Sequence, residues 1–415
     1  MPKYRYLLKD RNFLLHSIGQ IISQFGDRLV QIILVGLVYK LYPGSTTQLA
    51  KIFSFTLIPA FIISPIAGVF VDRWNNKKIM ITCDIIRGFL VLMLPVFIAT
   101  NQFAPIYAIV FLIFTCACFF LPAKFAVIPD LVTGEKFLLA NSLSTITTVV
   151  AGVAGLTFGG LVLEWIDIKQ TVYLNSIIYF TSAASLSFVV YRARKRKKDV
   201  HIGRREIKEV LKTSFIHEFK EGIKYLFSGE KVRFVIYILF LLMSMAGAIY
   251  VVSVVFIQEV MGSMTRDIGL FGIFLCIGLL VGSYYYGKQG ERFSKDGAIY
   301  TSLLVSGLLI ALFSAILQST SSFFMGGIIL FLLGIAVSPT MISANTIIHE
   351  AIDGDMRGRI FSSLGIIMNI GLLIFMFVGS ALADIIGKLW VLLLSGFAFF
   401  GFGLVGLILK NRNKR

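Results

Sequence analysis

Twelve long apolar runs divide the chain, and each is close to the length that a helix needs to cross a lipid bilayer. They occupy residues 13–39, 49–71, 79–99, 104–121, 139–163, 171–191, 232–258, 268–287, 298–317, 323–347, 360–383 and 389–409. About 20 apolar residues span the hydrocarbon core as a helix. The runs are continuously apolar rather than alternating, which argues against a membrane β-barrel. With 57% hydrophobic and 15% charged residues, the sequence predicts an all-α membrane protein of twelve spans.

Lys and Arg residues are distributed unevenly between the two sides of these spans. With the N-terminus placed inside, and residues at the very ends of spans counted with the adjacent side, 32 of the 39 basic residues are inner and five are outer. Arg28 and Arg87 lie deeper within spans. Such an excess marks the cytoplasmic side of a membrane protein. We therefore expect a multi-pass protein of the cell membrane, surrounded by lipid, with both termini cytoplasmic. The net charge of +17 is accounted for by this topology and predicts no nucleic-acid partner.

A polar segment separates the first six spans from the last six. Residues 192–231 begin with the basic run RARKRKKD, and apolar residues recur every three or four positions from 204 to 227. That spacing is typical of an amphipathic helix along the inner membrane face, although a plain linker between two halves is the simpler interpretation. The predicted domains are a six-helix bundle at 1–191, this segment, and a second six-helix bundle at 232–415.

The two halves also carry an internal repeat at an offset of 220 residues. IPDLVTGE at 128–135 aligns without a gap with IHEAIDGD at 348–355, and Glu164 aligns with Asp384. Two parallel six-helix repeats with a binding site between them near the bilayer midplane are one known transporter architecture. Glu164 and Asp384 are expected to be solvated residues at the outer helix ends, with an outer gate as the alternative.

Asp27 and Arg28 stand within the first span, where a charge is costly and often marks an ion or substrate pathway. Five polar residues fall within roughly 80° of one another on a helix: His16, Gln20, Gln24, Asp27 and Gln31. This stripe must face the protein interior or a water-filled cavity. Arg28 points about 100° away from Asp27 and is expected to reach another helix. Without that partner, Asp27 is predicted to bind and release a proton near physiological pH; a structural ion pair or hydrogen-bond cluster is the alternative.

The stretch GVFVDRWNNKK forms a short cytoplasmic hairpin between the second and third spans. It contains Gly68, Asp72, Arg73, Lys77 and Lys78, and it is followed by Asp84 and Arg87. The last two are three residues apart and can meet on one helix face. We interpret them as a structural or gating pair beneath the hairpin. A tight basic turn that obeys the positive-inside rule is the alternative interpretation of the hairpin.

The pattern G-x-x-x-D-R-x-x-x-K-K at this position resembles the loop signature of the major facilitator superfamily. Other stretches resemble the branch of that superfamily that includes macrolide, multidrug and siderophore exporters and lysophospholipid transporters. They are GQIISQFGDRLVQ, DRWNNKKIMITCDIIRG, PAKFAVIPDLV, LLANSLS, HEFKEGIKYLF and MRGRIFSSLG. The resemblance implies two pseudo-symmetric six-helix bundles that work by alternating access. It also implies that Gly68 permits close helix approach and that Asp72 helps to close the inner face. The fifth span, GVAGLTFGGLVLE, lacks the proline of the G-P-x-x-G-G element that antiporters often carry.

Other motifs that would indicate an enzyme or an ATP-driven pump are missing from the sequence. There is no G-x-x-x-x-G-K-[ST], H-E-x-x-H or G-x-S-x-G stretch, and the four cysteines all fall within apolar runs. We therefore predict no enzyme activity, no cofactor and no metal site. The predicted function is proton-coupled efflux of an amphipathic or hydrophobic small molecule, such as a drug, macrolide or siderophore, by a single chain. The alternatives are lysophospholipid flipping and a non-transporting membrane sensor.

Overall fold

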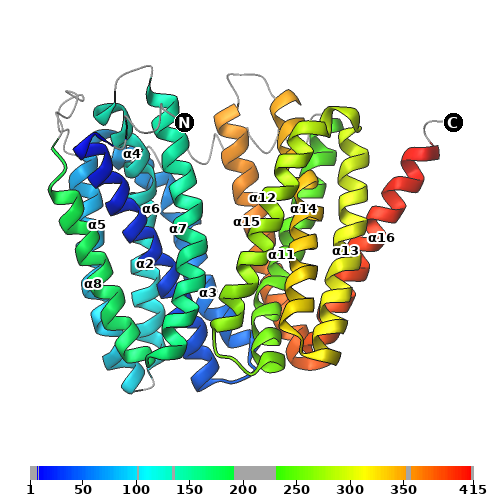
Figure 1. The fold of residues 1–415 in the computed structure, drawn as a ribbon, viewed down its shortest axis with the longest axis horizontal. Coiled ribbons are helices and arrows are strands. Elements are labelled where there is room, and N and C mark those ends of the chain that lie inside the picture. The colour runs from blue at the N-terminus through cyan, green and yellow to red at the C-terminus, as the bar shows by residue number, and fades with distance from the viewer. Residues whose placement is uncertain are drawn as a thin grey trace. The chain divides into compact units, whose positions relative to one another are not determined.

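The computed structural model describes residues 7, 9–100, 102–132, 136–190, 230–351 and 357–412, and these residues form helices joined by short turns (Figure 1). No strand occurs among them. The helices are α2 (Arg11–Leu41), α3 (Thr46–Ile62), α4 (Ser64–Arg73), α5 (Asn76–Ala99), α6 (Phe103–Leu131), α7 (Phe137–Trp165), α8 (Ile168–Ser187), α11 (Glu230–Met261), α12 (Arg266–Gln289), the 3₁₀ turn η3 (Gly290–Arg292), α13 (Lys295–Thr320), α14 (Phe323–Ala351), α15 (Arg357–Ile386) and α16 (Lys388–Arg412). Every predicted span overlaps a helix, so the all-α class is confirmed.

The second predicted span is the one that is divided, into α3 and α4. The break falls at Ile63, between Pro59 inside α3 and a proline in the first turn of α4. Proline has no N–H to donate and clashes with the preceding turn, whereas the first turn of a helix tolerates it. Among the described residues, ten helices are long and apolar enough to cross a membrane. The split pair and the more polar α8 complete the predicted set of twelve spans.

The predicted end of the fourth span, at residue 121, is wrong. Helix α6 continues through Pro122 and Pro129 to Leu131. A membrane helix tolerates an internal proline because neighbouring helices and side chains satisfy the freed carbonyl groups. The longer helix carries Lys124 into the packed interior, where it is fully buried. The sequence alone had assigned this lysine to an inner loop.

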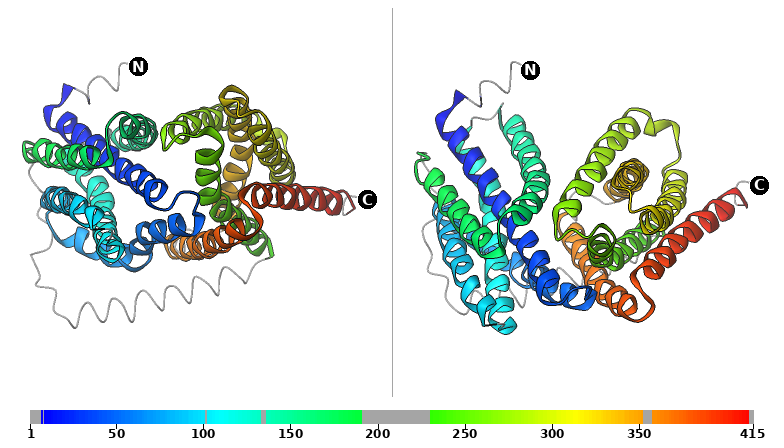
Figure 2. Two further views of the ribbon diagram at one scale, coloured as in Figure 1. Left: turned by 90° about the horizontal axis from the view of Figure 1, so that it is seen from below. Right: turned by 60° about the horizontal axis from the view of Figure 1, so that its bottom comes forward.

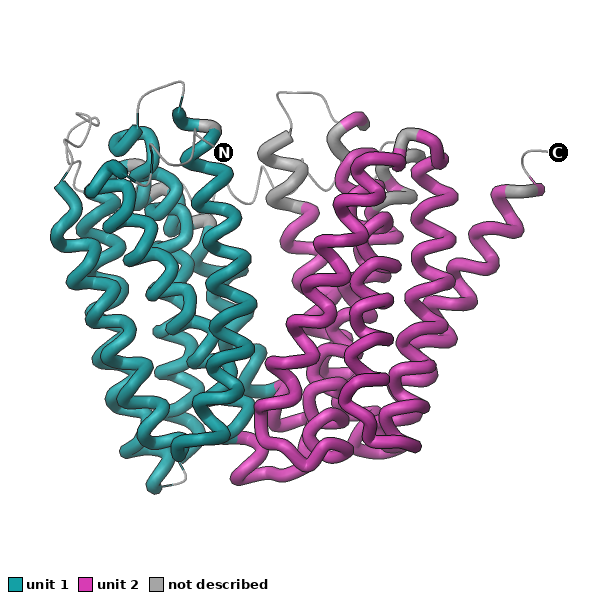
Figure 3. Tube along the Cα trace, in the orientation of Figure 1, with its two compact units in different colours: residues 1–37, 51–208 teal, residues 38–50, 209–415 magenta. Residues whose placement is uncertain are grey.

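The helices pack into two compact units (Figure 3). Unit 1 contains the described residues within 1–37 and 51–208, and unit 2 those within 38–50 and 209–415. In unit 1, α5 packs against α6 and α8; in unit 2, α11 packs on α15, α12 on α14 and α13 on α16 (Figure 2). The predicted segment 192–231, with its amphipathic stretch, lies outside the described residues apart from its last two positions. Its boundaries therefore stay a prediction.

The turn after α2 belongs to unit 2 and makes hydrogen bonds there to Asp384 of α15. Thr46 donates to the Asp384 carboxylate from its backbone N, at 3.2 Å, and from its Oγ1, at 2.6 Å, and the Thr47 N lies 3.3 Å from the second carboxylate oxygen. These donors belong to the first turn of α3, whose N–H groups have no partner within the helix. Asp384 is exposed, as expected for a helix end, but it also caps α3.

The internal repeat extends to every helix pair of the two halves. The pairs that begin 219 or 220 residues apart are α2 with α11, α3 with α12, α5 with α13, α6 with α14, α7 with α15 and α8 with α16. Sequence identity reveals the repeat clearly only around α7 and α15, because most lipid-facing and core positions accept any apolar residue of similar size. The positions of the helices along the chain therefore show the repeat even where the residue types do not.

Candidate functional site

A cluster of ionisable side chains joins α2 and α5 inside unit 1. Arg87 of α5 places its Nη1 2.8 Å from Oδ1 of Asp27 on α2. The same nitrogen lies 3.6 Å from Oδ1 of Asp84, one turn earlier on α5. One guanidinium therefore faces two carboxylates that come from different helices. Asp84 and Arg87 are three positions apart on α5, and this pair meets on one face as the spacing predicts.

Hydroxyl groups complete the hydrogen bonding of both carboxylates. The Tyr179 hydroxyl on α8 donates to Asp27 Oδ1 over 2.8 Å. Ser23 of α2 donates to Asp84 Oδ1 over 2.8 Å, and Ser182 of α8 donates to Asp84 Oδ2 over 2.6 Å. Neutral donors of this kind hold a carboxylate in place without cancelling its charge. The cluster therefore links α2, α5 and α8 through its polar atoms.

Water has unequal access to the members of this cluster. The side chains of Arg87 and Asp84 are 0% exposed, whereas that of Asp27 is 21% exposed. The guanidinium carbon of Arg87 lies 4.7 Å from the ring centre of Phe120 and 5.4 Å from that of Tyr179. Aromatic faces at this distance attract a cation. Asp27 is thus the carboxylate at the open edge of a buried cluster.

Arg87 does not use all of its hydrogen-bond donors within the described structure. Its Nε and Nη2 are buried and make no hydrogen bond to the described residues, while Nη1 also donates to Ser23 Oγ over 3.2 Å. Arginine carries five N–H donors and cannot be deprotonated in a protein. The cluster therefore contains one permanent positive charge and two carboxylates that can change their protonation. With both carboxylates ionised, these three groups together carry a net charge of −1.

Arg28 does not pair with Asp27, as the helix geometry predicts, and it lies against another helix as expected, since a Cβ at Gly152 of α7 would be 3.7 Å from its Nε. Its Nη1 donates to Gln31 Oε1 over 2.9 Å, and the side chain is exposed within the described structure. Its stem lies against α7, because a Cβ at Gly155 would come within 2.7 Å of the Arg28 Cβ. The expectation that Asp27 lacks a cationic partner is wrong: Arg87, 60 residues away in the sequence, supplies it.

The rest of the polar stripe on α2 changes from buried to half-buried along the helix. His16 and Gln20 are buried. Gln20 donates to Thr147 Oγ1 over 3.0 Å and accepts from Ser144 Oγ over 2.9 Å, both on α7. The Gln24 Nε2 donates to the Gln20 carbonyl over 3.2 Å. Gln24 and Gln31, like Asp27, remain partly exposed.

Lys124 is a further polar residue of unit 1 that the sequence reasoning missed. It is buried on α6, donates to Thr148 Oγ1 on α7 over 2.7 Å, and lies 4.5 Å from the ring centre of Phe125. The signal that could have found it is the apolar run that resumes after Pro122. A lysine between two such runs is surrounded by apolar residues if the proline does not end the helix.

The hairpin residues lie around the junction of α4 and α5. Gly68, Asp72 and Arg73 are in α4, and the side chain of Asp72 is not among the described groups. Lys77, in the first turn of α5, donates to the carbonyls of Ser187 and Val189 over 2.8 and 2.7 Å. These two hydrogen bonds connect the hairpin to the C-terminal end of α8.

The remaining hairpin features concern the cap of α5 and the glycine. Asn75 caps α5 by accepting from the Lys78 backbone N over 3.2 Å, which is a common way to begin a helix. A Cβ at Gly68 would meet no described atom within 4 Å. Packing inside unit 1 therefore does not require the glycine that the resemblance assigned to close helix approach. Among the described residues, no group of three or more His, Cys, Asp or Glu side chains is placed to hold a metal ion.

Comparison with known protein families identifies the chain from its whole length. Residues 17–371 match the family model described as Major Facilitator Superfamily, and residues 265–415 match it a second time. The chain belongs to the major facilitator superfamily. It is a multi-pass membrane transporter of that superfamily and not an enzyme.

Two relatives that the chain resembles over most of its length are named as exporters. The chain is 28% identical over 402 residues to the proposed bacilysin exporter BacE of Bacillus subtilis (strain 168), covering 94% of this chain and 93% of the relative. It is 26% identical over 395 residues to macrolide efflux protein A of Streptococcus pyogenes, with 91% of each chain covered.

Solved structures agree with this fold. A bacterial homologue of the iron transporter ferroportin in an inward-facing state superimposes with a TM-score of 0.74 at 15% identity, over 96% of this chain and 99% of that one. A peptide transporter in complex with alafosfalin superimposes with a TM-score of 0.69 at 15% identity, over 96% and 94%. At these identities the likeness concerns the fold alone.

Proposed function

We propose that this major facilitator exports an amphipathic or hydrophobic small molecule in exchange for protons, with Asp27 as the carboxylate that couples the two. One observation carries the proposal: Asp27 is the partly exposed carboxylate of an otherwise fully buried charge cluster. Ionisable residues at membrane depth that face a cavity are typical of proton relays in transporters. The exporter relatives support the direction of transport.

The proposed coupling step is a change in the charge of the cluster. A proton that arrives at Asp27 converts the net charge of the three groups from −1 to zero and weakens the attraction between Asp27 and Arg87. Arg87 can then turn further toward Asp84, whose Oδ1 is already 3.6 Å away. Because Asp27 lies on α2 and Asp84 on α5, this exchange alters the force between two helices, and the Tyr179 hydroxyl links α8 to the same event.

The driving force of proton entry is sufficient for uphill export. A proton that crosses a potential of 100 mV releases about 2.3 kcal/mol, and one pH unit adds about 1.4 kcal/mol. Together these correspond to a substrate gradient of roughly 500-fold for one proton per substrate molecule. In this proposal the half-buried Gln24 and Gln31 and the exposed Arg28 line the substrate path. The buried His16 and Gln20 support that path from behind, and the hairpin with Asp72 and Arg73 acts as the inner gate.

The test is transport of erythromycin, a macrolide, in proteoliposomes with an imposed pH gradient. Asp27→Asn removes the titratable group but keeps the shape, so we expect substrate to equilibrate without accumulating against its gradient. The matched control is Glu164→Gln, which neutralises an acid on α7 of the same half outside the cluster and should accumulate substrate normally. Accumulation by Asp27→Asn at the wild-type level contradicts the coupling role. Accumulation by the wild-type protein without a pH gradient or potential contradicts proton coupling altogether.

The same liposomes distinguish the alternative functions. Energy-independent lysophospholipid flipping predicts movement of a fluorescent lysolipid between leaflets that a proton uncoupler does not change. A sensor predicts binding of a ligand without movement of any of these compounds. Bacilysin is the second compound to test, because one relative is named for its export.

A further inference from the structure

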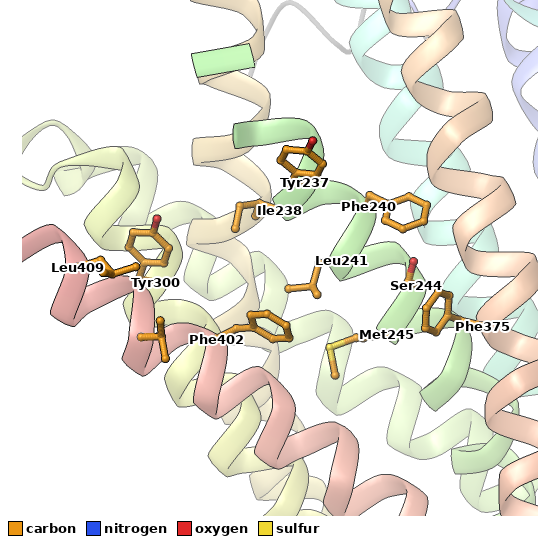
Figure 4. A pocket seen from close by; sticks show the side chains of 12 residues that line it. Tyr237, Ile238, Phe240, Leu241, Ser244, Met245, Tyr300, Phe375, Phe402 and Leu409 are labelled. Carbon is orange, nitrogen blue, oxygen red and sulfur yellow. The ribbon is translucent and has the colours of Figure 1, made fainter. Parts of the chain in front are cut away.

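Unit 2 contains a cavity that is separate from the charge cluster. It has a volume of about 460 Å³ and lies between α11, α13, α15 and α16 (Figure 4). Each of these helices is long and apolar enough to cross a membrane. The size is that of a binding pocket for a small molecule or part of a larger one. Nothing in the proposed coupling step uses this cavity.

Close packing of α16 on α13 creates the space. A Cβ at Gly403 would overlap the backbone of Leu304, and a Cβ at Gly406 would overlap the ring of Tyr300. Small residues allow membrane helices to approach in this way. Because α16 is held so close to α13 here, Phe402 lines an open space beside α11 instead of filling a contact with it (Figure 4).

The lining is almost entirely apolar and open to the membrane side of the unit. Leu241 and Met245 of α11 face Phe402 of α16 and Phe375 of α15 across the cavity. The rim is accessible, since Tyr237 is 60% exposed and Val405 is 54% exposed. Within a membrane-spanning unit, such a rim meets hydrocarbon, and an apolar chain can enter from the bilayer without crossing water.

Both walls of the cavity continue into an arginine at the same end. On α11, Tyr237 and Leu241 follow Arg233 at intervals of four residues, which places all three on one helix face. On α16, Val405 and Leu409 precede Arg412 at intervals of four and three residues. Both arginines are exposed. The hydroxyls of Tyr237 and Tyr300 also point toward this end (Figure 4), as tyrosines do at a membrane–water interface.

We propose that this cavity binds one acyl chain of an anionic phospholipid, whose headgroup lies at the end of the unit where α11 carries Arg233 and α16 carries Arg412. The apolar walls match the chain, and the two arginines match the charge of the headgroup. Basic pockets between membrane helices on the cytoplasmic side hold anionic headgroups in this manner, and the positive-inside count assigns this end to the cytoplasm. The proposal is independent of the transported compound, because it concerns a site within unit 2 alone.

The experiment measures lipid binding to the purified full-length protein by native mass spectrometry. The probes are phosphatidylglycerol and phosphatidylcholine with the same palmitoyl and oleoyl chains. We expect a preference for phosphatidylglycerol that falls about fivefold for each of Arg233→Gln and Arg412→Gln. Leu241→Trp, which fills the cavity, is expected to abolish the tightest phosphatidylglycerol site. The matched controls are Leu404→Trp, next to the cavity on α16, and Arg292→Gln, a cation elsewhere in unit 2.

Each outcome decides for or against the proposal. Loss of the site in Leu241→Trp but not in Leu404→Trp supports it, provided that both variants unfold within a few degrees of the wild-type protein. Equal binding of the two lipids, or an unchanged preference after removal of both arginines, overturns it. A wild-type dimer in light scattering that Leu241→Trp converts to a monomer also overturns it, because a second chain is then the occupant. Displacement of erythromycin by filling the cavity overturns it in favour of a substrate site. Since Asp27 lies in unit 1, failure here leaves the Asp27→Asn result unchanged.

Discussion

Replacing Arg87 by leucine is expected to destabilise unit 1 severely. The substitution leaves the methylene volume of the side chain largely filled but removes the positive charge between Asp27 and Asp84. Asp84 is 0% exposed, and within the described part of the chain it keeps the hydroxyls of Ser23 and Ser182 as its hydrogen-bond partners. An ionised carboxylate in that position has neither water nor a cation to stabilise it.

The size of the expected loss of stability follows from the burial of Arg87 and Asp84. Removing one partner of a buried ion pair costs about 3–5 kcal/mol, because the other charge remains buried without compensation. This corresponds to a change of roughly a hundredfold to several thousandfold in the unfolding equilibrium. The 21% exposure of Asp27 means that water can partly replace the guanidinium there. Most of the cost is therefore expected to come from Asp84.

A double-mutant cycle with Asp84→Asn measures this directly. Each variant is purified in the same detergent, and its free energy of unfolding is measured by titration with sodium dodecyl sulfate. Asp84→Asn combined with Arg87→Leu is expected to be more stable than Arg87→Leu alone, with a coupling of about 1–3 kcal/mol between the two sites. If Arg87→Leu is as stable as the wild-type protein, or if the two substitutions are additive, the cluster is hydrated and the charge argument fails.

Three further substitutions test other parts of the structure. Gly155→Leu places a side chain against the Arg28 stem, where even a Cβ would approach within 2.7 Å, and should lower the thermal unfolding midpoint at a cost of about 1–3 kcal/mol. The control is Gly401→Leu in α16, where a Cβ would meet no described atom within 4 Å. Asp384→Ala removes the cap of α3 and should lower the free energy of unfolding by about 1 kcal/mol. Faster hydrogen exchange is expected in the first turn of α3 alone. Unchanged exchange at Thr46 and Thr47 would show that the cap is not formed. Lys124→Met removes a buried ammonium whose hydrogen bond among the described residues is to Thr148. The free energy of unfolding should stay unchanged or rise by about 1 kcal/mol or more. A clear loss of stability contradicts this expectation.

The positions of the spans follow from the sequence because lipid offers no hydrogen bonds. A backbone inside a bilayer must form helices, and the thickness of the bilayer sets their length. The runs of apolar residues therefore predict the helices within a few residues. The exceptions are both at prolines. The chain breaks at Ile63 between Pro59 and the proline that begins α4, yet it continues through Pro122, and the local sequence does not show which proline the neighbouring helices accommodate.

The polar residues of the candidate site were also visible in the sequence, but their partners were not. Asp27 and Arg87 stand out because charges are rare within apolar runs. Their contact joins positions 60 residues apart, and it depends on how α2, α5 and α8 pack. Arg28 was the nearer cation in the sequence, and the 100° turn between successive residues of a helix keeps it away from Asp27.

The sequence by itself determined that lipid surrounds the chain, how many spans it forms and that the two halves repeat. These features depend on local hydropathy and on an offset that can be read along the chain. Only the tertiary structure decided which charges share a hydrogen-bond network, that Lys124 is buried, and that a cavity opens beside α16. Those features arise where helices distant in the sequence approach one another. The distance between such helices is set by small residues on one of them, such as Gly403 and Gly406, and by the residues that face these glycines on the other helix.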